Sequence, residues 1–102
     1  MSALTDIARG EPCMVRLSGI CNRNPETTVA AHYRLAGLCG TGLKPLDILA
    51  AWSCADCHDA IDCRVGKYDY TRAELRLAHA EAVMRTIDRL VRDGRIEIRV
   101  RG

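Results

Sequence analysis

The chain has 102 residues, a formal net charge of +2, six cysteines, 48% hydrophobic residues and no phenylalanine. This length favours a single domain, residues 1–102, with a thin aliphatic core, and the charge is too small by itself to indicate a nucleic-acid partner. The N-terminus has no apolar leader and no stretch is long enough to cross a membrane, so we expect a soluble, cytoplasmic protein without a membrane partner.

Short elements are expected in the first half of the chain. Residues 3–9 are typical of a helical turn before Gly10, and residues 13–17 alternate enough to predict a strand. Gly19 then predicts a turn that carries Cys21. Residues 27–34 have the β-branched content of a strand that ends near His32.

A second strand and a helix follow. Glycines and Pro45 make residues 37–45 irregular, and Asp47 comes next. Residues 48–52 form an apolar segment that we expect to be a strand, with a helical turn as the alternative for so short a segment. Residues 54–62 contain no helix breaker. A helix there puts His58 and Asp62 on the same face, four residues apart.

The C-terminal part predicts a connecting loop, a long helix and a last strand. The loop covers residues 64–70, and a capping box of Thr71 and Glu74 opens an amphipathic helix over residues 71–93 that Gly94 ends. Residues 95–101 alternate strictly, which predicts an edge strand, with a frayed tail as the alternative. That strand and the apolar helix could pair two copies into a homodimer.

Four cysteines form two pairs, Cys13 with Cys21 and Cys54 with Cys57. Together they can supply four thiolates to one structural zinc ion, because zinc favours a closed tetrahedron of sulfur ligands. Seven residues lie between the first two cysteines, which is wider than the usual zinc knuckle. The alternative is that these two are small buried hydrophobic residues, as free cysteines often are.

Two other uses of the cysteines remain open. In a secreted domain six cysteines would indicate disulfides, whereas a reducing compartment favours metal ligands. The sequence from Cys54 to Cys57 also fits a redox motif, although the strand–helix–strand pattern of a thioredoxin-like domain is missing. Cys39 and Cys63 have no partner at ligand spacing, and we interpret them as packing residues.

A set of short motifs is similar to the HNH endonucleases of the ββα-metal, or His-Me finger, class. The resemblance is greatest to a family of small prophage-encoded proteins that are classed as nucleases. It rests on Cys-Met-Val-Arg (13–16), Gly-Ile-Cys-Asn (19–22), Asn-Pro-Glu-Thr (24–27), Ala-His-Tyr-Arg-Leu (31–35), Gly-Leu-Cys-Gly-Thr-Gly (37–42), Lys-Pro (44–45), Asp47 and Cys-His-Asp-x-Ile-Asp (57–62). It covers residues 1 to about 64.

The resemblance implies an α+β fold with a ββα-metal core and a zinc knot in residues 1–64, followed by the helix and edge strand in residues 65–102. It implies hydrolysis of DNA phosphodiester bonds in phage DNA processing or recombination. His32 would be the general base, Asp47 would orient it, and His58 with Asp62 would bind a catalytic Mg²⁺, Mn²⁺ or Zn²⁺ ion. Arg34 or Lys44 could bind phosphate.

Two residues depart from the family pattern. Ala31 stands where many relatives have a metal ligand, and Asp47 replaces an asparagine, so a group that only accepts hydrogen bonds takes the place of an amide that can donate. Without the resemblance, His32 would be interpreted as a packing residue, His58 as another candidate zinc ligand, and His79 as an ordinary surface or core residue.

The rival hypothesis is a zinc-knuckle module without catalytic activity that binds nucleic acid or another protein. Both hypotheses predict zinc and DNA binding. Loss of DNA cleavage in His32→Ala, with zinc, folding and DNA binding retained, would separate them.

Overall fold

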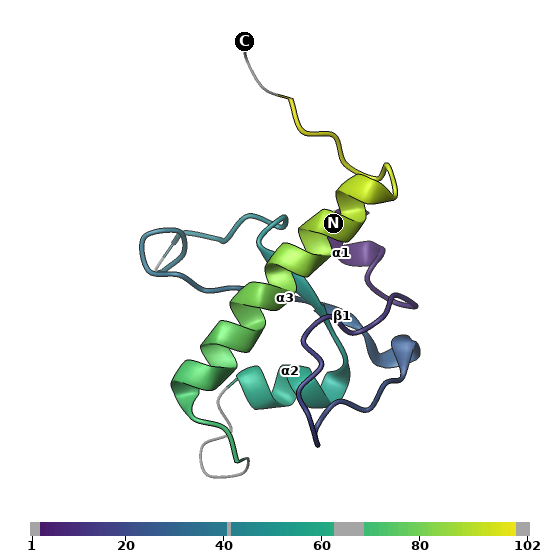
Figure 1. Ribbon diagram of the computed structural model, residues 1–102. Coiled ribbons are helices and arrows are strands. Elements are labelled where there is room, and N and C mark those ends of the chain that lie inside the picture. Colours follow the sequence, from purple (N-terminus) through teal and green to yellow (C-terminus); the bar gives the residue numbers. More distant parts are fainter. Residues whose placement is uncertain (1–2, 41, 63–68, 100–102) are drawn as a thin grey trace.

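The structure is a computed structural model that describes residues 3–40, 42–62 and 69–99. Its elements confirm an α+β fold (Figure 1). They are α1 (Ala3–Asp6), the 3-10 helix η1 (Pro25–Thr27), β1 (Val29–His32), β2 (Ala50–Ser53), α2 (Ala55–Ile61) and α3 (Arg72–Arg92). None of the helices in these residues has the length and apolar character needed to cross a membrane.

The sheet contains two antiparallel strands, β1 and β2. Val29 pairs with Ser53 and His32 pairs with Ala50. Both predicted strands are present, but β1 begins two residues later than the predicted segment because Pro25–Thr27 forms η1, and β2 is shifted toward the C-terminus. Every residue of β2 is buried, and burial of Trp52 alone stabilises the fold by roughly 2–3 kcal/mol.

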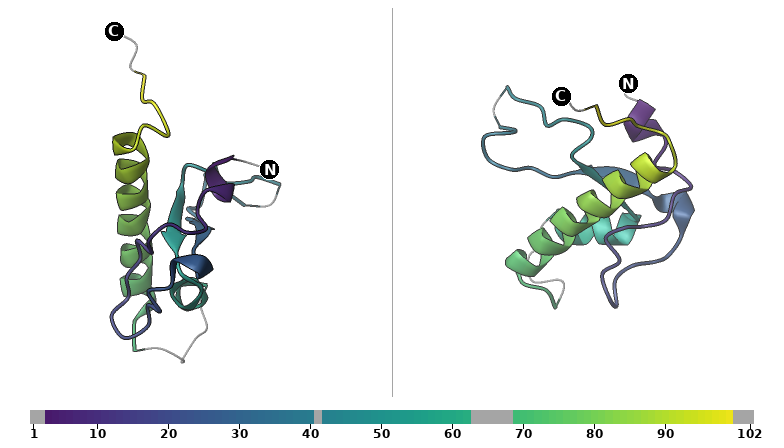
Figure 2. Two further views of the ribbon diagram at one scale, coloured as in Figure 1. Left: turned by 90° about the vertical axis from the view of Figure 1, so that its right-hand side faces the viewer. Right: turned by 45° about the horizontal axis from the view of Figure 1, so that its top comes forward.

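The long predicted helix is confirmed as α3, which begins with the predicted capping box. Thr71 Oγ1 accepts a hydrogen bond from the Glu74 amide, and the Glu74 carboxylate accepts one from the Thr71 amide. α3 forms one layer, and the sheet, α2 and the N-terminal segment form the other (Figure 2). Thr86 Oγ1 joins the layers, because it accepts a hydrogen bond from the buried Trp52 amide at 3.0 Å.

The segment before η1 has no strand, and the prediction of a strand over residues 13–17 is wrong. The Met14 amide donates to the carbonyl of Trp52 at 2.7 Å, which attaches the segment to β2 at one point. Arg16 has a φ of 53°, and this left-handed conformation cannot continue a strand. Apolar alternation here reflects burial of Met14, Val15 and Leu17 beside β2 and α3.

The predicted C-terminal edge strand is also wrong over residues 95–99, the part that the structure describes. The amides of Arg95 and Ile96 both donate to the carbonyl of Leu90 and so close the end of α3. Beyond this point the chain leads away from the two layers (Figure 1), and Ile98 is 65% exposed. In the described part of the chain, no strand pairs with residues 95–99. Cys63 and most of the predicted loop over residues 64–70 lie outside the described residues.

The glycine-rich loop between the two strands is confirmed as irregular. Two isolated bridges, Ala36 with Cys39 and Gly40 with Leu43, shape it. The loop returns to the sheet where the Tyr33 amide donates to the carbonyl of Leu49 at 2.8 Å. This return brings Asp47 back beside the end of β1.

Candidate functional site

The four predicted cysteines come together at the N-terminal end of α2. The Sγ atoms of Cys13, Cys21, Cys54 and Cys57 all lie within 4.8 Å of one another, and those of Cys21 and Cys54 are 3.9 Å apart. In a tetrahedral zinc site with Zn–S bonds of about 2.3 Å, the sulfur atoms are roughly 3.8 Å apart. The donor set therefore fits a zinc ion, as the spacing of the cysteines predicted.

Backbone amides point at these sulfur atoms. Cys54 is the N-cap of α2, and its Sγ accepts a hydrogen bond from the Cys57 amide at 3.4 Å. The Arg16 amide donates in the same way to Cys13 Sγ at 3.5 Å. N–H groups beside sulfur stabilise negative charge there, as the thiolate ligands of a metal ion require.

The protonation states of Cys13, Cys21 and Cys57 are interdependent. A hydrogen bond from the Cys57 thiol lowers the pKa of Cys13 to about 4, and the same bond raises the pKa of Cys57. Burial raises the pKa of Cys21. Four negative charges this close repel one another, so a bound cation is what would allow all four sulfur atoms to be thiolates. His58 is not one of the residues gathered here.

His32 and Asp47 form the second part of the site. His32 Nε2 and Asp47 Oδ1 are 2.8 Å apart, and the His32 and Asp47 side chains are 24% and 33% exposed. A carboxylate only accepts hydrogen bonds, so Nε2 carries the proton. In the neutral ring Nδ1 then holds a lone pair that can accept a proton. Aspartate at position 47 thus fits its neighbour, because the histidine supplies the donor.

His58 in α2 and Asp62, the C-cap residue of this helix, lie on the same face. His58 Nε2 lies 3.4 Å from Asp62 Oδ2, and the His58 and Asp62 side chains are 37% and 53% exposed. The predicted helix placed these two residues side by side, and the structure confirms this. A nitrogen and an oxygen at this separation can both reach one cation at bond lengths of about 2.1 Å.

A cleft of about 290 Å³ connects these elements. His32 and Asp62 both line it, together with Arg34 from the segment after β1. Lys44, the other predicted phosphate ligand, is exposed in the glycine-rich loop and does not line this cleft.

α3 contributes three cleft residues that the sequence reasoning missed: Arg72, Arg76 and His79. Their spacing of four and three residues puts them on one face of a helix, and this pattern could have revealed them. Arg76 lies over the Tyr33 ring, with Cζ 4.7 Å from the ring centroid. With Arg34, the two arginines of α3 bring three guanidinium groups to one cleft, which favours an anionic ligand.

His79 is more than an ordinary surface residue. Its Nε2 donates to the carbonyl oxygen of Ala31 at 2.8 Å, and its ring packs against Tyr33 with the ring centroids 5.0 Å apart. Burial lowers the pKa of His79, so the ring is neutral near neutral pH. His79 therefore fixes the backbone next to His32. Ala31 is buried and offers no side-chain ligand.

These features define a small α+β protein with four cysteines that could hold a metal ion and with a cleft lined by histidine, aspartate and arginine. The model of the family described as Putative nuclease YbcO matches residues 2–95, and the chain belongs to this family.

Two relatives carry the same description, and one solved structure has a similar fold. The chain is 58% identical over 64 residues to Putative nuclease YbcO of Escherichia coli (strain K12) and to Putative nuclease ybcO of Enterobacteria phage 82. In both cases the match spans 63% of this chain and 67% of the relative. A solved structure of a putative bacteriophage protein from Escherichia coli K-12 superposes with a TM-score of 0.72 at 38% identity, over 87% of this chain and 96% of the other.

Proposed function

We propose that the protein is a metal-dependent endonuclease of the HNH, or ββα-metal, class that hydrolyses phosphodiester bonds in DNA. The observation that carries the proposal is the arginine-lined cleft shared by His32, which contacts Asp47, and Asp62, which contacts His58. The order β1, β2, α2 supports the ββα assignment, and membership of a family described as nucleases supports the reaction class.

His32 is the general base in this proposal. Asp47 holds the proton on Nε2 and leaves Nδ1 to take a proton from the attacking water molecule. As the ring becomes an imidazolium ion, the carboxylate stabilises its positive charge. The hydrogen bond from His79 to Ala31 keeps the end of β1 in place during this step.

His58 and Asp62 hold the catalytic divalent cation. A cation bound there would polarise the phosphate and stabilise the leaving oxygen. His58 lies in α2 and Asp62 is the C-cap residue of this helix, while Cys54 is its N-cap residue. The metal centre thus fixes the position of the cation-binding pair.

The arginines bind the DNA backbone. Arg34, Arg72 and Arg76 approach the cleft from the segment after β1 and from α3. Guanidinium groups suit phosphate oxygens because they donate parallel hydrogen bonds. The described relative from Enterobacteria phage 82 supports a role in phage DNA processing or recombination.

A cleavage assay with His32→Ala tests the proposal. Purified wild-type protein should nick or linearise supercoiled plasmid with Mg²⁺ or Mn²⁺, and EDTA should stop the reaction. His32→Ala should retain its zinc content, thermal unfolding temperature and DNA affinity, but lose cleavage. Cleavage at the wild-type rate by this variant would refute the role of His32. DNA binding without cleavage by the wild-type protein, whichever cation is added, would favour the zinc-knuckle binding module instead.

A further inference from the structure

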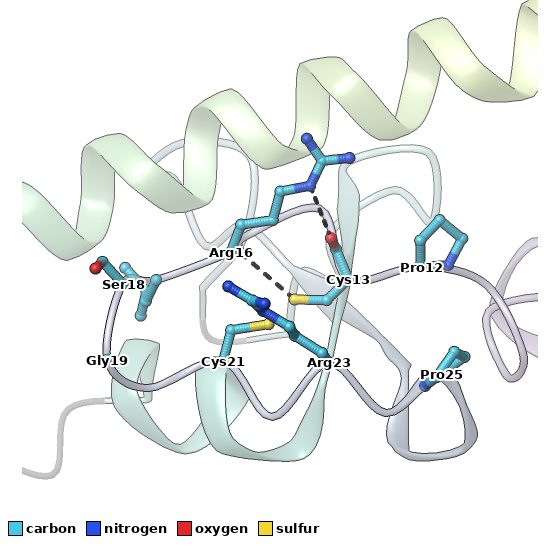
Figure 3. Close-up of a pocket in the computed structure, with 9 residues that line it drawn as sticks. Pro12, Cys13, Arg16, Ser18, Gly19, Cys21, Arg23 and Pro25 are labelled. Atoms are coloured by element: carbon cyan, nitrogen blue, oxygen red, sulfur yellow. Dashed lines mark hydrogen bonds between the residues drawn. The ribbon is translucent and has the colours of Figure 1, made fainter.

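A second hollow lies beside the metal centre, on the turns that carry Cys13 and Cys21. It has a volume of about 450 Å³ and is lined by both cysteines and by Arg16 and Arg23 (Figure 3). The mechanism proposed above uses neither arginine. Each of them follows a cysteine ligand by two or three residues.

Both arginines have a backbone conformation that favours glycine or asparagine. Arg16 has a φ of 53° and Arg23 a φ of 58°, and these are the non-glycine residues with positive φ among those described. The conformation turns the Arg16 amide toward Cys13 Sγ and the Arg23 amide toward Cys21. Glycine would make the same backbone contact without steric cost, so the turns alone do not explain an arginine at both positions.

The Arg16 side chain is fixed on the turn that carries Cys13. Its Nε donates to the carbonyl of Cys13 at 3.1 Å, and its Nη2 lies 3.3 Å from Met14 Sδ (Figure 3 shows the first contact). Arg23 lines the same hollow. Within the described part of the chain, neither guanidinium group forms a salt bridge with a carboxylate.

We propose that Arg16 and Arg23 neutralise the charge of the zinc-loaded cysteine centre and thereby strengthen its hold on the metal. The inference rests on zinc binding by the four cysteines. Four thiolates and one Zn²⁺ ion have a net charge of 2−, from −4 + 2, and two guanidinium groups add 2+, which brings the centre to neutrality. Charged and hydrogen-bonding groups next to metal ligands typically change metal affinity by about 10- to 100-fold.

Zinc competition tests the inference on the whole chain. Arg16→Gln and Arg23→Gln keep the backbone amides but remove the charges, so each should lower zinc affinity by about tenfold in a titration with a chromophoric chelator. The double variant should lose more. Arg23→Lys should stay close to wild type, because the charge is retained. Arg92→Gln is the matched control, since Arg92 pairs with Asp88 on the exposed face of α3.

Two further measurements, cobalt absorption and DNA affinity, distinguish the possible outcomes. Cobalt-loaded variants should keep the absorption of a tetrahedral thiolate site, which would show that the ligands are unchanged. Unaltered zinc affinity in the double variant would overturn the inference. If DNA affinity falls while zinc affinity is unchanged, the two arginines form a phosphate contact instead, and charge neutralisation is wrong. A wild-type chain that binds no zinc would overturn the metal centre itself, and the inference with it.

Discussion

His32 at the end of β1 and Asp47 in the loop before β2 are in direct contact, with Nε2 and Oδ1 2.8 Å apart. The contact spans 15 positions in the sequence and forms because the glycine-rich loop returns to the sheet. An acceptor at Nε2 determines which ring nitrogen carries the proton. The candidate base is therefore oriented by a residue outside the sheet.

Asp47→Asn should leave the fold intact and lower the cleavage rate by about 5- to 10-fold. The amide oxygen can still accept from Nε2 and keep the proton there, as the asparagine of the family pattern would, but a neutral amide stabilises the imidazolium ion less than a carboxylate does. Single-turnover plasmid cleavage at saturating protein measures the effect. Asp88→Asn, on the exposed face of α3, is the control and should cleave normally. Equal rates for Asp47→Asn and wild type would show that the contact has no catalytic role.

Arg34 and Lys44 offer a direct comparison of cleft and loop cations. Arg34 lines the cleft and Lys44 does not. Arg34→Gln should therefore weaken DNA binding and lower the slope of log Kd against log salt concentration by about one. Lys44→Gln should change neither the affinity nor the slope. Fluorescence anisotropy with EDTA present, at several salt concentrations, separates binding from cleavage. A larger effect for Lys44→Gln would place the DNA path over the glycine-rich loop.

Cys57 and Cys39 should respond differently to serine. Cys57→Ser removes one of four metal ligands, and we expect loss of stoichiometric zinc and a large drop in the thermal unfolding temperature, since a structural zinc ion contributes directly to folding. Cys39 is half-buried and stands apart from the cluster, so Cys39→Ser should retain zinc and lose little stability. Metal analysis and thermal unfolding decide the matter. Full zinc content in Cys57→Ser would contradict a four-cysteine site.

Thr86→Val should destabilise the protein by about 1–3 kcal/mol. Thr86 Oγ1 accepts from the Trp52 amide and donates to the carbonyl of Ala82 at 2.8 Å, and valine of similar size would leave the buried amide without an acceptor. Urea denaturation monitored by Trp52 fluorescence measures the change. Thr86→Ser keeps the hydroxyl group and should lose less. Equal losses for both variants would point to packing rather than to the hydrogen bond.

Acid should destabilise the fold through His79. Burial lowers the pKa of His79 in the folded state below its ordinary 6.5, with His58, Asp62 and Arg76 as the nearby charges. Below pH 6.5 the unfolded chain therefore binds more protons at this residue, so stability falls as the pH decreases. His79→Gln should show a smaller loss of urea midpoint between pH 7.5 and pH 5. An identical loss would assign the acid sensitivity to other groups.

The sequence predicted the elements whose signals are local. Thr71 and Glu74 define the start of α3 because a capping box needs only four residues, and the helical spacing of His58 and Asp62 gave their contact. The four cysteines could be grouped because zinc chemistry limits the ligand types. The first two predictions required no knowledge of distant contacts, and the grouping of the cysteines required only the ligand chemistry of zinc.

The predictions that failed concern features that depend on tertiary contacts. The alternation at residues 13–17 predicted a strand, but the positive φ of Arg16 is incompatible with a strand at this point. Residues 95–99 alternate in the same way, yet no strand lies beside them in the described structure. Arg76 and His79 reach the cleft only because α3 packs against β2, and a single sequence does not give that packing angle.

The sulfur atom of Cys54 caps the helix that carries His58 and Asp62. A helix of seven residues is not stable in isolation, so its order depends on the assembled cluster. In the proposed nuclease, the helix that holds the cation-binding pair would therefore become ordered only after the four sulfur atoms have taken up their ion. A newly synthesised chain without that ion would lack the geometry for cleavage.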